Sequence, residues 1–240
     1  MLQTYYTSLS VKTQLTPDVY HLHFELIEPR ELTFIPGQYM IMLVPQANGE
    51  PVRRLYSIVS PDSQKNSFEL IIKIEPNGKA STYVLNMLVG DRAIFQGPAG
   101  VFRLKKDNSK EKVFLATGCG IAPMRSILLS VIARNNDILY RLFWGLPTYK
   151  DVYMLDELKN SQQRHPNFQF TVCLSREQNL DMVPENDRKY FAIGHITDCF
   201  STGPTAEYYL CGSRHVTDSL KEFLLKEKAI SPDRVVFEKF

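Results

Sequence analysis

The residues of this sequence that are best placed for chemistry include a glycine-containing turn, Thr117-Gly118-Cys119-Gly120. The turn follows an apolar run typical of a strand and precedes an apolar pattern of helical spacing, with Pro123 suited to a first helical turn. The start of a helix offers unpaired N–H groups to a phosphate, and glycines let the backbone approach it. Because the spacing differs from G-x-G-x-x-G, these residues alone fit a phosphate-binding loop and a tight turn without a ligand equally well.

A second turn, Cys211-Gly212, also ends a predicted strand and precedes a predicted helix. Ligands of open parallel sheets bind at the carboxyl ends of the strands, so we expect both turns at one edge of one sheet. Taken alone, Cys211 fits a small buried apolar residue better than a site residue.

The first half of the chain contributes Arg54-Leu55-Tyr56-Ser57, at the start of a predicted strand. An arginine offers a fork of donors to a phosphate. A tyrosine two residues on, on the same face, can stack on an aromatic ring or hydrogen-bond a polyol chain. Taken alone, the tetrapeptide fits an ordinary solvated strand better.

Strand patterns dominate the sequence before residue 105. Residues 19–26 alternate, with Leu22, Phe24 and Leu26 on one face and polar residues between them. Similar runs, separated by turn signals, are found at 39–44, 53–60 and 68–74, and one helical pattern is found at 82–88. Short strands with one helix predict a small antiparallel β-barrel.

Strand and helix patterns alternate beyond a polar stretch at 105–112, which we interpret as a linker. Strands are predicted at 112–116, 141–144, 168–174, 208–211 and 235–238, and helices at 123–132, 152–158 and 216–225. The alternation predicts a parallel sheet with helices on both faces. The predicted domains are residues 1–106 and 107–240.

Composition and charge narrow the classes of protein. A chain of 240 residues with 44% hydrophobic and 22% charged residues is long enough for two modest globular domains, each with its own core. The net charge of +2 lacks the basic excess of nucleic-acid-binding proteins, so we expect no nucleic-acid partner.

The cysteines show no C-x-x-C spacing and are expected to be free thiols of a reducing compartment, without a metal: Cys119, Cys173, Cys199 and Cys211. Residues 1–10 contain no apolar signal segment. No apolar run approaches the roughly 20 residues that span a bilayer. We therefore expect a cytoplasmic protein without a membrane span.

Six motifs, in this order and spacing, resemble those of the ferredoxin–NADP reductase superfamily over nearly the whole chain. They are Phe34-Ile35-Pro36-Gly37-Gln38-Tyr39, Arg54 to Ser57, Gly78-Lys79-Ala80-Ser81, Gly97-Pro98-Ala99-Gly100, Thr117 to Pro123, and Cys211-Gly212. The resemblance implies an N-terminal antiparallel β-barrel that binds FAD, followed by a Rossmann-like α/β domain that binds NADP. It also implies an oxidoreductase that transfers hydride from a nicotinamide dinucleotide to FAD.

The resemblance implies roles for residues around the flavin. Arg54 would hold the flavin phosphates, Tyr56 would pack on the isoalloxazine, and the Ser57 hydroxyl would lie by flavin N5; Leu55 belongs to the same motif. Backbone amides of a second segment would hold the FAD pyrophosphate: Gly78, Lys79, Ala80 and Ser81.

The resemblance also implies roles around the nicotinamide dinucleotide. Thr117, Gly118 and Gly120 would belong to the loop that binds the pyrophosphate of the dinucleotide. Gly212 would belong to the residue pair Cys211-Gly212 under the nicotinamide. Cys211 would lie near nicotinamide C4. Near the C-terminus, Phe240 would cover the flavin face, and Glu238 would lie near the site. Ser57, Cys211 and Glu238 are thus the predicted catalytic residues.

Ser175-Arg176 resembles the segment of the family that binds the 2′-phosphate, and Arg176 would form a bidentate pair with that phosphate, assisted by Lys189 or Tyr190. This favours NADPH as the cofactor. NADH stays open, because Glu177 is a neighbouring anion and family members with a similar Glu-Lys-Phe ending serve oxygenases with NADH.

The C-x₄-C-x₂-C run of a fused iron–sulfur domain is absent, so we expect electrons to leave to a separate carrier, a ferredoxin or a flavodoxin. Lys79, Lys105 and Lys106 are the predicted docking cations. Four alternatives remain: an NADH-dependent reductase component of an oxygenase system, a free-flavin reductase, a non-catalytic flavin-binding regulatory module, and an electron-transfer subunit of a larger complex. His21 and His23 are expected to face solvent.

Overall fold

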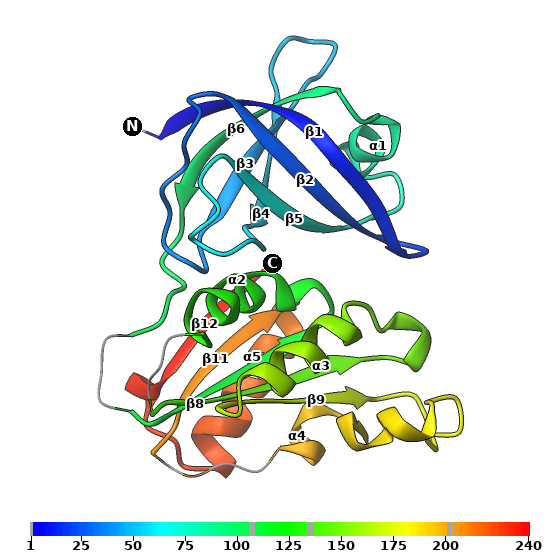
Figure 1. Ribbon diagram of the computed structural model, residues 1–240, viewed down its shortest axis with the longest axis vertical. Helices are drawn as coiled ribbons and strands as arrows, with labels where there is room; N and C mark the ends of the chain where they lie inside the picture. The colour runs from blue at the N-terminus through cyan, green and yellow to red at the C-terminus, as the bar shows by residue number, and fades with distance from the viewer. Residues whose placement is uncertain (1, 106–108, 134–136, 201–202, 204) are drawn as a thin grey trace. The chain divides into compact units, whose positions relative to one another are not determined.

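The structure, a computed structural model, describes residues 2–105, 109–133, 137–200, 203 and 205–240 (Figure 1). The chain divides into two units, Met1–Leu104 with Arg125–Ser130, and Lys105–Met124 with Val131–Phe240. Each unit is built around its own six-stranded sheet. The predicted boundary between residues 106 and 107 lies outside the described residues.

The sheet of the first unit is antiparallel between all neighbours, in the order β4-β3-β6-β1-β2-β5. A β-bridge between Ile58 and Leu70 joins the chain just after β4 to β5, at the opposite end of this order. The sheet therefore closes on itself, which confirms the predicted barrel. Its elements are β1 (Gln3–Thr16), β2 (Val19–Glu28), β3 (Tyr39–Val44), β4 (Val52–Ser57), β5 (Ser67–Lys73), α1 (Lys79–Asn86) and β6 (Arg92–Ala99).

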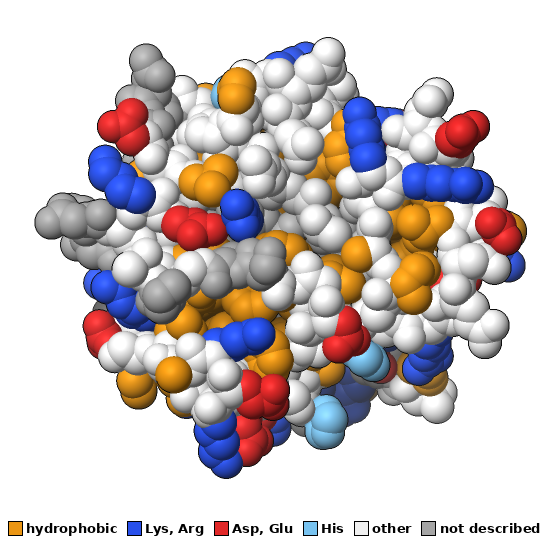
Figure 2. Space-filling view, turned by 90° about the horizontal axis from the view of Figure 1, so that it is seen from below, with side chains coloured by type: hydrophobic (Ala, Val, Ile, Leu, Met, Phe, Trp, Pro, Cys, Tyr) orange, Lys and Arg blue, Asp and Glu red, His pale blue; other side chains and the backbone are white. Residues whose placement is uncertain are grey.

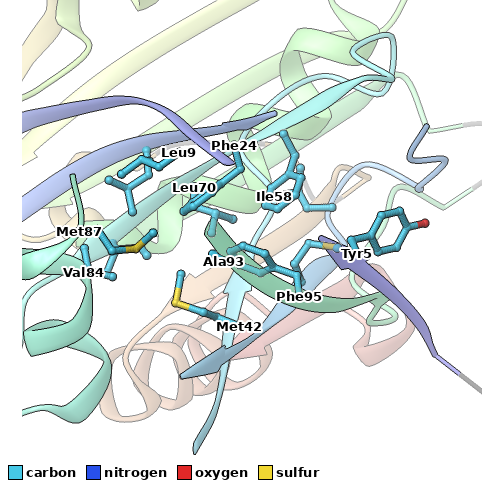
Figure 3. Packing of buried hydrophobic residues seen from close by; sticks show 14 of the residues in the cluster. Tyr5, Leu9, Phe24, Met42, Ile58, Leu70, Val84, Met87, Ala93 and Phe95 are labelled. Carbon is cyan, nitrogen blue, oxygen red and sulfur yellow. The ribbon is translucent and has the colours of Figure 1, made fainter. Parts of the chain in front are cut away.

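Aromatic side chains from three strands fill the interior of this barrel. Phe95 of β6 lies edge-on to Phe24 of β2 and to Phe68 of β5, with ring centroids 4.9 and 5.0 Å apart. Edge-to-face pairs stabilise by about 0.5–1.5 kcal/mol beyond the burial of their area. Figure 3 shows Phe24 and Phe95 in the same interior as Met42 and Leu70, which come from other strands. The alternation predicted for residues 19–26 thus places one face of β2 in the core.

His21 lies on the face of β2 opposite Phe24, where it is partly buried and contacts Glu69. The prediction that His21 faces solvent is therefore wrong. Nε2 of His21 lies 3.0 Å from Oε2 of Glu69, and Nη1 of Arg125, which also belongs to the first unit, lies 2.9 Å from the same oxygen. Burial alone raises the pKa of Glu69, but the His21 hydrogen bond and the Arg125 charge outweigh it and lower this pKa from 4.5 to about 2. His23 is likewise engaged, 3.2 Å from Gln64.

The sheet of the second unit is parallel throughout, in the order β10-β9-β8-β7-β11-β12. Its strands are β7 (Glu111–Thr117), β8 (Leu139–Leu146), β9 (Phe168–Leu174), β10 (Phe191–Ile193), β11 (Glu207–Gly212) and β12 (Val235–Lys239). The helices of this part of the chain are α2 (Ile121–Val131), whose residues Arg125–Ser130 belong to the first unit, α3 (Leu155–Arg164), α4 (Ile196–Cys199) and α5 (Arg214–Glu222). A π-helical turn lies at Phe223–Glu227, and 3₁₀ turns lie at Gly118–Gly120, Tyr149–Asp151, Glu185–Tyr190 and Pro232–Arg234.

The central strand β7 is buried on both faces, as expected for a parallel sheet. Val113 and Leu115 pack in a cluster with Leu220 of α5. Phe114, between them, points to the other face and stacks on Tyr209 of β11, with ring centroids 5.2 Å apart. The predicted Rossmann-like α/β architecture is confirmed.

Several predicted element bounds differ from the structure. The helix predicted at 82–88 begins at Lys79, so Gly78 is its N-cap residue. The helix predicted at 152–158 begins only at Leu155, because Met154 takes a left-handed φ of 57°. The strand predicted at 53–60 ends at Ser57. Four elements, β1, β6, β10 and α4, were not predicted from the sequence.

The predicted linker at 105–112 is wrong at its end, since β7 begins at Glu111. Lys112 is only 2% exposed, and its Nζ lies 2.7 Å from Oε2 of Glu207. The Tyr209 hydroxyl donates to the same carboxylate oxygen at 2.6 Å. Because both buried charges have a partner, this arrangement avoids the penalty of an isolated buried ion.

All four cysteines are free thiols. Within the described ranges, no helix is long and apolar enough to cross a membrane, and no group of three or more His, Cys, Asp or Glu side chains is arranged to hold a metal ion. On the face that Figure 2 shows, basic and acidic side chains are interspersed. The cytoplasmic location stays a prediction.

The low pKa of Glu69 makes the stability of the first unit depend on pH. A depressed pKa contributes stability above the unfolded value of about 4.5, and this is lost as pH falls toward about 2. We expect Glu69→Gln to lower the free energy of unfolding by about 3 kcal/mol at pH 6 and by less at pH 3. Urea unfolding at both pH values measures this difference. Glu25→Gln, at an exposed position of β2, is the control, and a deficit of E69Q that stays constant between pH 6 and pH 3 would contradict the assignment.

Candidate active site

The order of the parallel sheet creates one point where ligands are expected to bind. From β7 the chain adds β8, β9 and β10 on one side, then returns to add β11 and β12 on the other. The crevice at such a switch point lies between the carboxyl ends of β7 and β11. Thr117 ends β7 and Gly118 follows it, and Cys211-Gly212 ends β11, so the two turns predicted to lie at one edge are neighbours.

The two turns approach each other closely, with a glycine of each at the contact. A Cβ on Gly120 would lie 2.1 Å from the carbonyl oxygen of Cys211, and a Cβ on Gly212 would lie 2.1 Å from Oγ1 of Thr117. Backbone atoms fill the first space, so it cannot accept a side chain, whereas the second could do so only if the Thr117 hydroxyl turned away. The two turns are therefore packed directly against each other, which fixes the strand ends that border the crevice.

Cys211 is buried at this point and pairs in register with Glu238 of β12. Burial raises the pKa of the Cys211 thiol, and the negative charge of Glu238 raises this pKa further. The thiol is consequently neutral at ordinary pH and is a poor nucleophile. The structure thus brings the predicted residues Cys211, Gly212 and Glu238 together, while their catalytic roles stay predictions.

Phe240 is attached to the same turn through its backbone. Its N–H donates to the carbonyl of Gly212 at 3.3 Å, and its carbonyl accepts from the N–H of Arg214 at 3.2 Å. The side chain of Phe240 is 66% exposed. An exposed ring on a fixed backbone is able to stack on a planar ligand, but the predicted stacking on the flavin stays a prediction.

Ser175 and Arg176 follow β9 at the same edge of the sheet. The backbone of Ser175 bonds the carbonyl of Leu146, and that of Arg176 bonds the carbonyl of Pro147. The Arg176 side chain is exposed, whereas Oε1 of Glu177 accepts the N–H of Tyr149 at 3.1 Å. The neighbouring anion is therefore engaged with the backbone, and the cation is presented to solvent.

The two residues predicted to assist Arg176 have other contacts. Tyr190 stacks on Phe170, with ring centroids 4.9 Å apart and planes inclined by 5°. Nζ of Lys189 lies 5.0 Å from the centroid of the Tyr190 ring. These contacts fix Tyr190 against the sheet.

In the first unit, the motif Arg54–Ser57 forms the last four residues of β4. Arg54 is exposed, and its Nη1 donates to the carbonyl of Arg53 at 2.9 Å. Tyr56 packs against the barrel core, and burial raises its pKa, opposed by the charge of Arg54. Leu55, on the other face of the strand, is 56% exposed.

The motif Gly78–Ser81 is the first turn of α1, which packs against β3 and β4. A Cβ on Gly78 would lie 2.9 Å from Oγ of Ser81, and that hydroxyl accepts the N–H of Glu75 at 2.8 Å. The first N–H groups of a helix have no partner within it. A helix start next to β4, with the arginine of β4 exposed, fits the phosphates of FAD.

The predicted docking lysines differ in their surroundings. Lys79 is exposed at the start of α1. The Lys105 side chain donates to the carbonyl of Asp233, and its N–H donates to the hydroxyl of Tyr209, so Lys105 has a structural role. Lys106 lies outside the described residues.

Two residues that were not predicted from the sequence contact the nucleotide turn. Trp144 of β8 and Tyr153, just before α3, both donate hydrogen bonds to the carbonyl of Gly118. In the sequence their aromatic side chains cannot be distinguished from other core residues, so no sequence pattern predicts this contact.

Comparisons with known proteins agree with this geometry. An oxidoreductase FAD-binding domain matches residues 6–104, and an oxidoreductase NAD-binding domain matches residues 114–222. The reductase component of propane 2-monooxygenase from Mycolicibacterium smegmatis is 30% identical over all of this chain and 68% of its own length. An NADH-cytochrome b5 reductase-like protein of Homo sapiens is 31% identical over 88% of this chain and 69% of its own.

Among solved structures, the cytochrome P450 reductase GcoB of Amycolatopsis superposes with a TM-score of 0.86 at 26% identity, over all of this chain and 70% of its own. This chain spans between 60 and 68% of the length of the propane 2-monooxygenase reductases that it matches. Two nucleotide-binding domains in this order, with their glycine turns at the expected strand ends, confirm the predicted cofactors FAD and NAD(P). The chain belongs to the ferredoxin–NADP reductase superfamily of FAD- and NAD(P)-dependent oxidoreductases.

Proposed function

We propose that this protein oxidises NADPH and passes the electrons through FAD to a separate redox protein. The observation that carries the proposal is the switch point of the parallel sheet, where Gly120 and Gly212 lie at the close contact between the turns after β7 and β11. It is combined in one chain with an FAD-binding domain. FAD, when bound, accepts a hydride and releases single electrons, which links a two-electron donor to a one-electron carrier.

The residues of the chain bind and orient the two cofactors in this proposal. Arg54 pairs with the flavin phosphates, and Tyr56, fixed by its packing, supports the isoalloxazine. The Ser57 hydroxyl hydrogen-bonds near flavin N5. On the nicotinamide side, the neutral Cys211 thiol and Glu238 lie beside the reacting ring and exclude water from it.

The identity of the acceptor is the least constrained part of the proposal. A ferredoxin or a flavodoxin fits a flavin that releases electrons singly, and exposed Lys79 offers a docking charge. A second candidate acceptor is the oxygenase of a multicomponent system. This acceptor is favoured by the propane 2-monooxygenase, toluate 1,2-dioxygenase and phenol 2-monooxygenase reductases among the relatives. In this alternative NADH, not NADPH, would be the electron donor.

Anaerobic titration of the purified protein with NADPH, and separately with NADH, tests the proposal. We expect a bound flavin whose absorbance band is bleached by a stoichiometric amount of NADPH. The same amount of NADH should bleach it more slowly. Faster bleaching by NADH would support the oxygenase-type alternative. A flavin that neither nucleotide bleaches would indicate a regulatory module. A protein that binds riboflavin as well as FAD would indicate a free-flavin reductase.

Arg54 and Arg53 are adjacent on β4 and point to opposite faces, so they form a matched pair of positions. We expect Arg54→Ala to weaken FAD binding at least ~10-fold, because a charge-assisted pair with a phosphate is lost. Arg53→Ala should retain FAD. Fluorescence titration of the apoprotein of each variant with FAD, and with riboflavin for comparison, measures the two FAD affinities. Equal FAD affinity of the two variants would contradict the role of Arg54.

The exposed Arg176 is expected to discriminate between the two nicotinamide nucleotides. Arg176→Ala should raise KM for NADPH ~10-fold or more and leave KM for NADH unchanged, because only NADPH carries the 2′-phosphate. Steady-state kinetics with both nucleotides measure the split. Arg164→Ala, at an exposed arginine of α3, is the control. A parallel change for both nucleotides would refute the assignment.

A further inference from the structure

Two aromatic side chains hydrogen-bond the carbonyl oxygen of Gly118 in the nucleotide turn. Nε1 of Trp144 donates at 3.0 Å, and the hydroxyl of Tyr153 donates at 3.3 Å. The N–H of Ile121 also bonds this carbonyl, as part of the 3₁₀ turn. A carbonyl oxygen has two lone pairs, so its accepting capacity is fully used inside the second unit.

Both donors are held rigidly by their own surroundings. Trp144 is fully buried, Tyr153 is 6% exposed, and their rings pack edge to face with centroids 4.7 Å apart. The segment before Tyr153 is fixed by Asp151, whose carboxylate accepts from both the N–H and the hydroxyl of Thr148 and whose N–H donates to the carbonyl of Thr148. The donors are therefore in place before any ligand binds, which is what preorganisation requires.

The Gly118–Cys119 peptide has two orientations open to it, because glycine tolerates a wide range of backbone angles and Gly118 has a φ of +50°. In a trans peptide the C=O and the following N–H point in opposite directions. Holding the Gly118 carbonyl toward Trp144 and Tyr153 turns the N–H of Cys119 away from these rings. The reversed peptide would present a partially negative oxygen in the place of that N–H.

We infer that Trp144 and Tyr153 are positioning residues for the nicotinamide dinucleotide: they select the peptide orientation that presents an N–H donor, rather than a carbonyl, to its pyrophosphate. The inference rests on the proposed function, which assigns the turn to the dinucleotide. It adds that affinity for the phosphates is set by two side chains that do not touch the ligand.

Tyr153→Phe tests the inference with the loss of one oxygen atom, while the ring that packs on Trp144 remains. We expect the dissociation constants of NADP⁺ and NAD⁺ to rise about fivefold, the change that corresponds to one neutral hydrogen bond of about 1 kcal/mol. KM for the reduced nucleotide should rise by the same factor with kcat at saturation unchanged. Affinity for adenosine, which has no phosphate, should not change.

Tyr208→Phe is the matched control. Tyr208 is a buried tyrosine of the same unit whose hydroxyl donates to a backbone carbonyl, that of Gly203, at 2.8 Å. The two variants lose the same kind of hydrogen bond and should show similar thermal stability, yet only Y153F should lose dinucleotide affinity. A purely structural role of Tyr153 would make the two variants alike in every binding measurement.

Isothermal titration calorimetry with NADP⁺, NAD⁺ and adenosine, on protein loaded with FAD, separates the outcomes. Wild-type affinity of Y153F for both dinucleotides, or an equal loss for adenosine, would overturn this inference and leave the proposed function standing. Failure of the wild-type protein to bind either dinucleotide would overturn the proposed function and the inference with it.

Discussion

The contact between the turns that follow β7 and β11 is the constraint on which the second unit depends. Two strands that are almost one hundred residues apart in the sequence end so close together that Gly120 abuts the carbonyl of Cys211, and Gly212 abuts the hydroxyl of Thr117. A methyl group at Gly120 would meet backbone atoms and force the strand ends apart, and one at Gly212 would displace the Thr117 hydroxyl. Because each turn also begins a helix, the same contact brings two helix starts to one edge of the sheet.

The constraint reaches beyond the two turns through strand register. Once Cys211 is fixed beside the first turn, the parallel pairing of β11 with β12 places Glu238 next to Cys211 and Lys239 next to Gly212. Phe240 follows with two backbone bonds to the Gly212–Arg214 segment. The residues predicted around the nicotinamide are therefore assembled by hydrogen-bonded register alone, and no long side chain has to reach across the sheet.

Much of this arrangement was predictable because it follows from short-range patterns. The bounds of β3 and β9 match the apolar runs at 39–44 and 168–174, and each glycine turn lies where the strand pattern stops. The failures share a cause, a contact made with a distant residue. Lys112 reads as part of a solvated linker because its partner Glu207 lies 95 positions later. His21 reads as exposed because nothing local indicates Glu69 or Arg125.

The hydrogen bonds from Trp144 and Tyr153 to the Gly118 carbonyl were not predicted, for a different reason. The sequence identifies the glycines but not the direction of their peptides, since peptide orientation is a property of the surroundings. Trp144 and Tyr153 supply those surroundings from two other segments of the chain. A sequence motif can therefore locate a phosphate loop without showing whether the loop is built to receive an anion.

The electrostatics of the switch point argue that the chain keeps this region free of competing chemistry. A thiolate at Cys211 would be a nucleophile. Burial and the charge of Glu238 both raise the pKa of that thiol, and the hydrogen bond from the backbone at Gly212 opposes them only in part. Burial is the main reason that the sulfur stays protonated, and the carboxylate of Glu238 adds to it. A neutral, polarisable sulfur at this position is a poor nucleophile and would suit the role beside the nicotinamide that is proposed for Cys211.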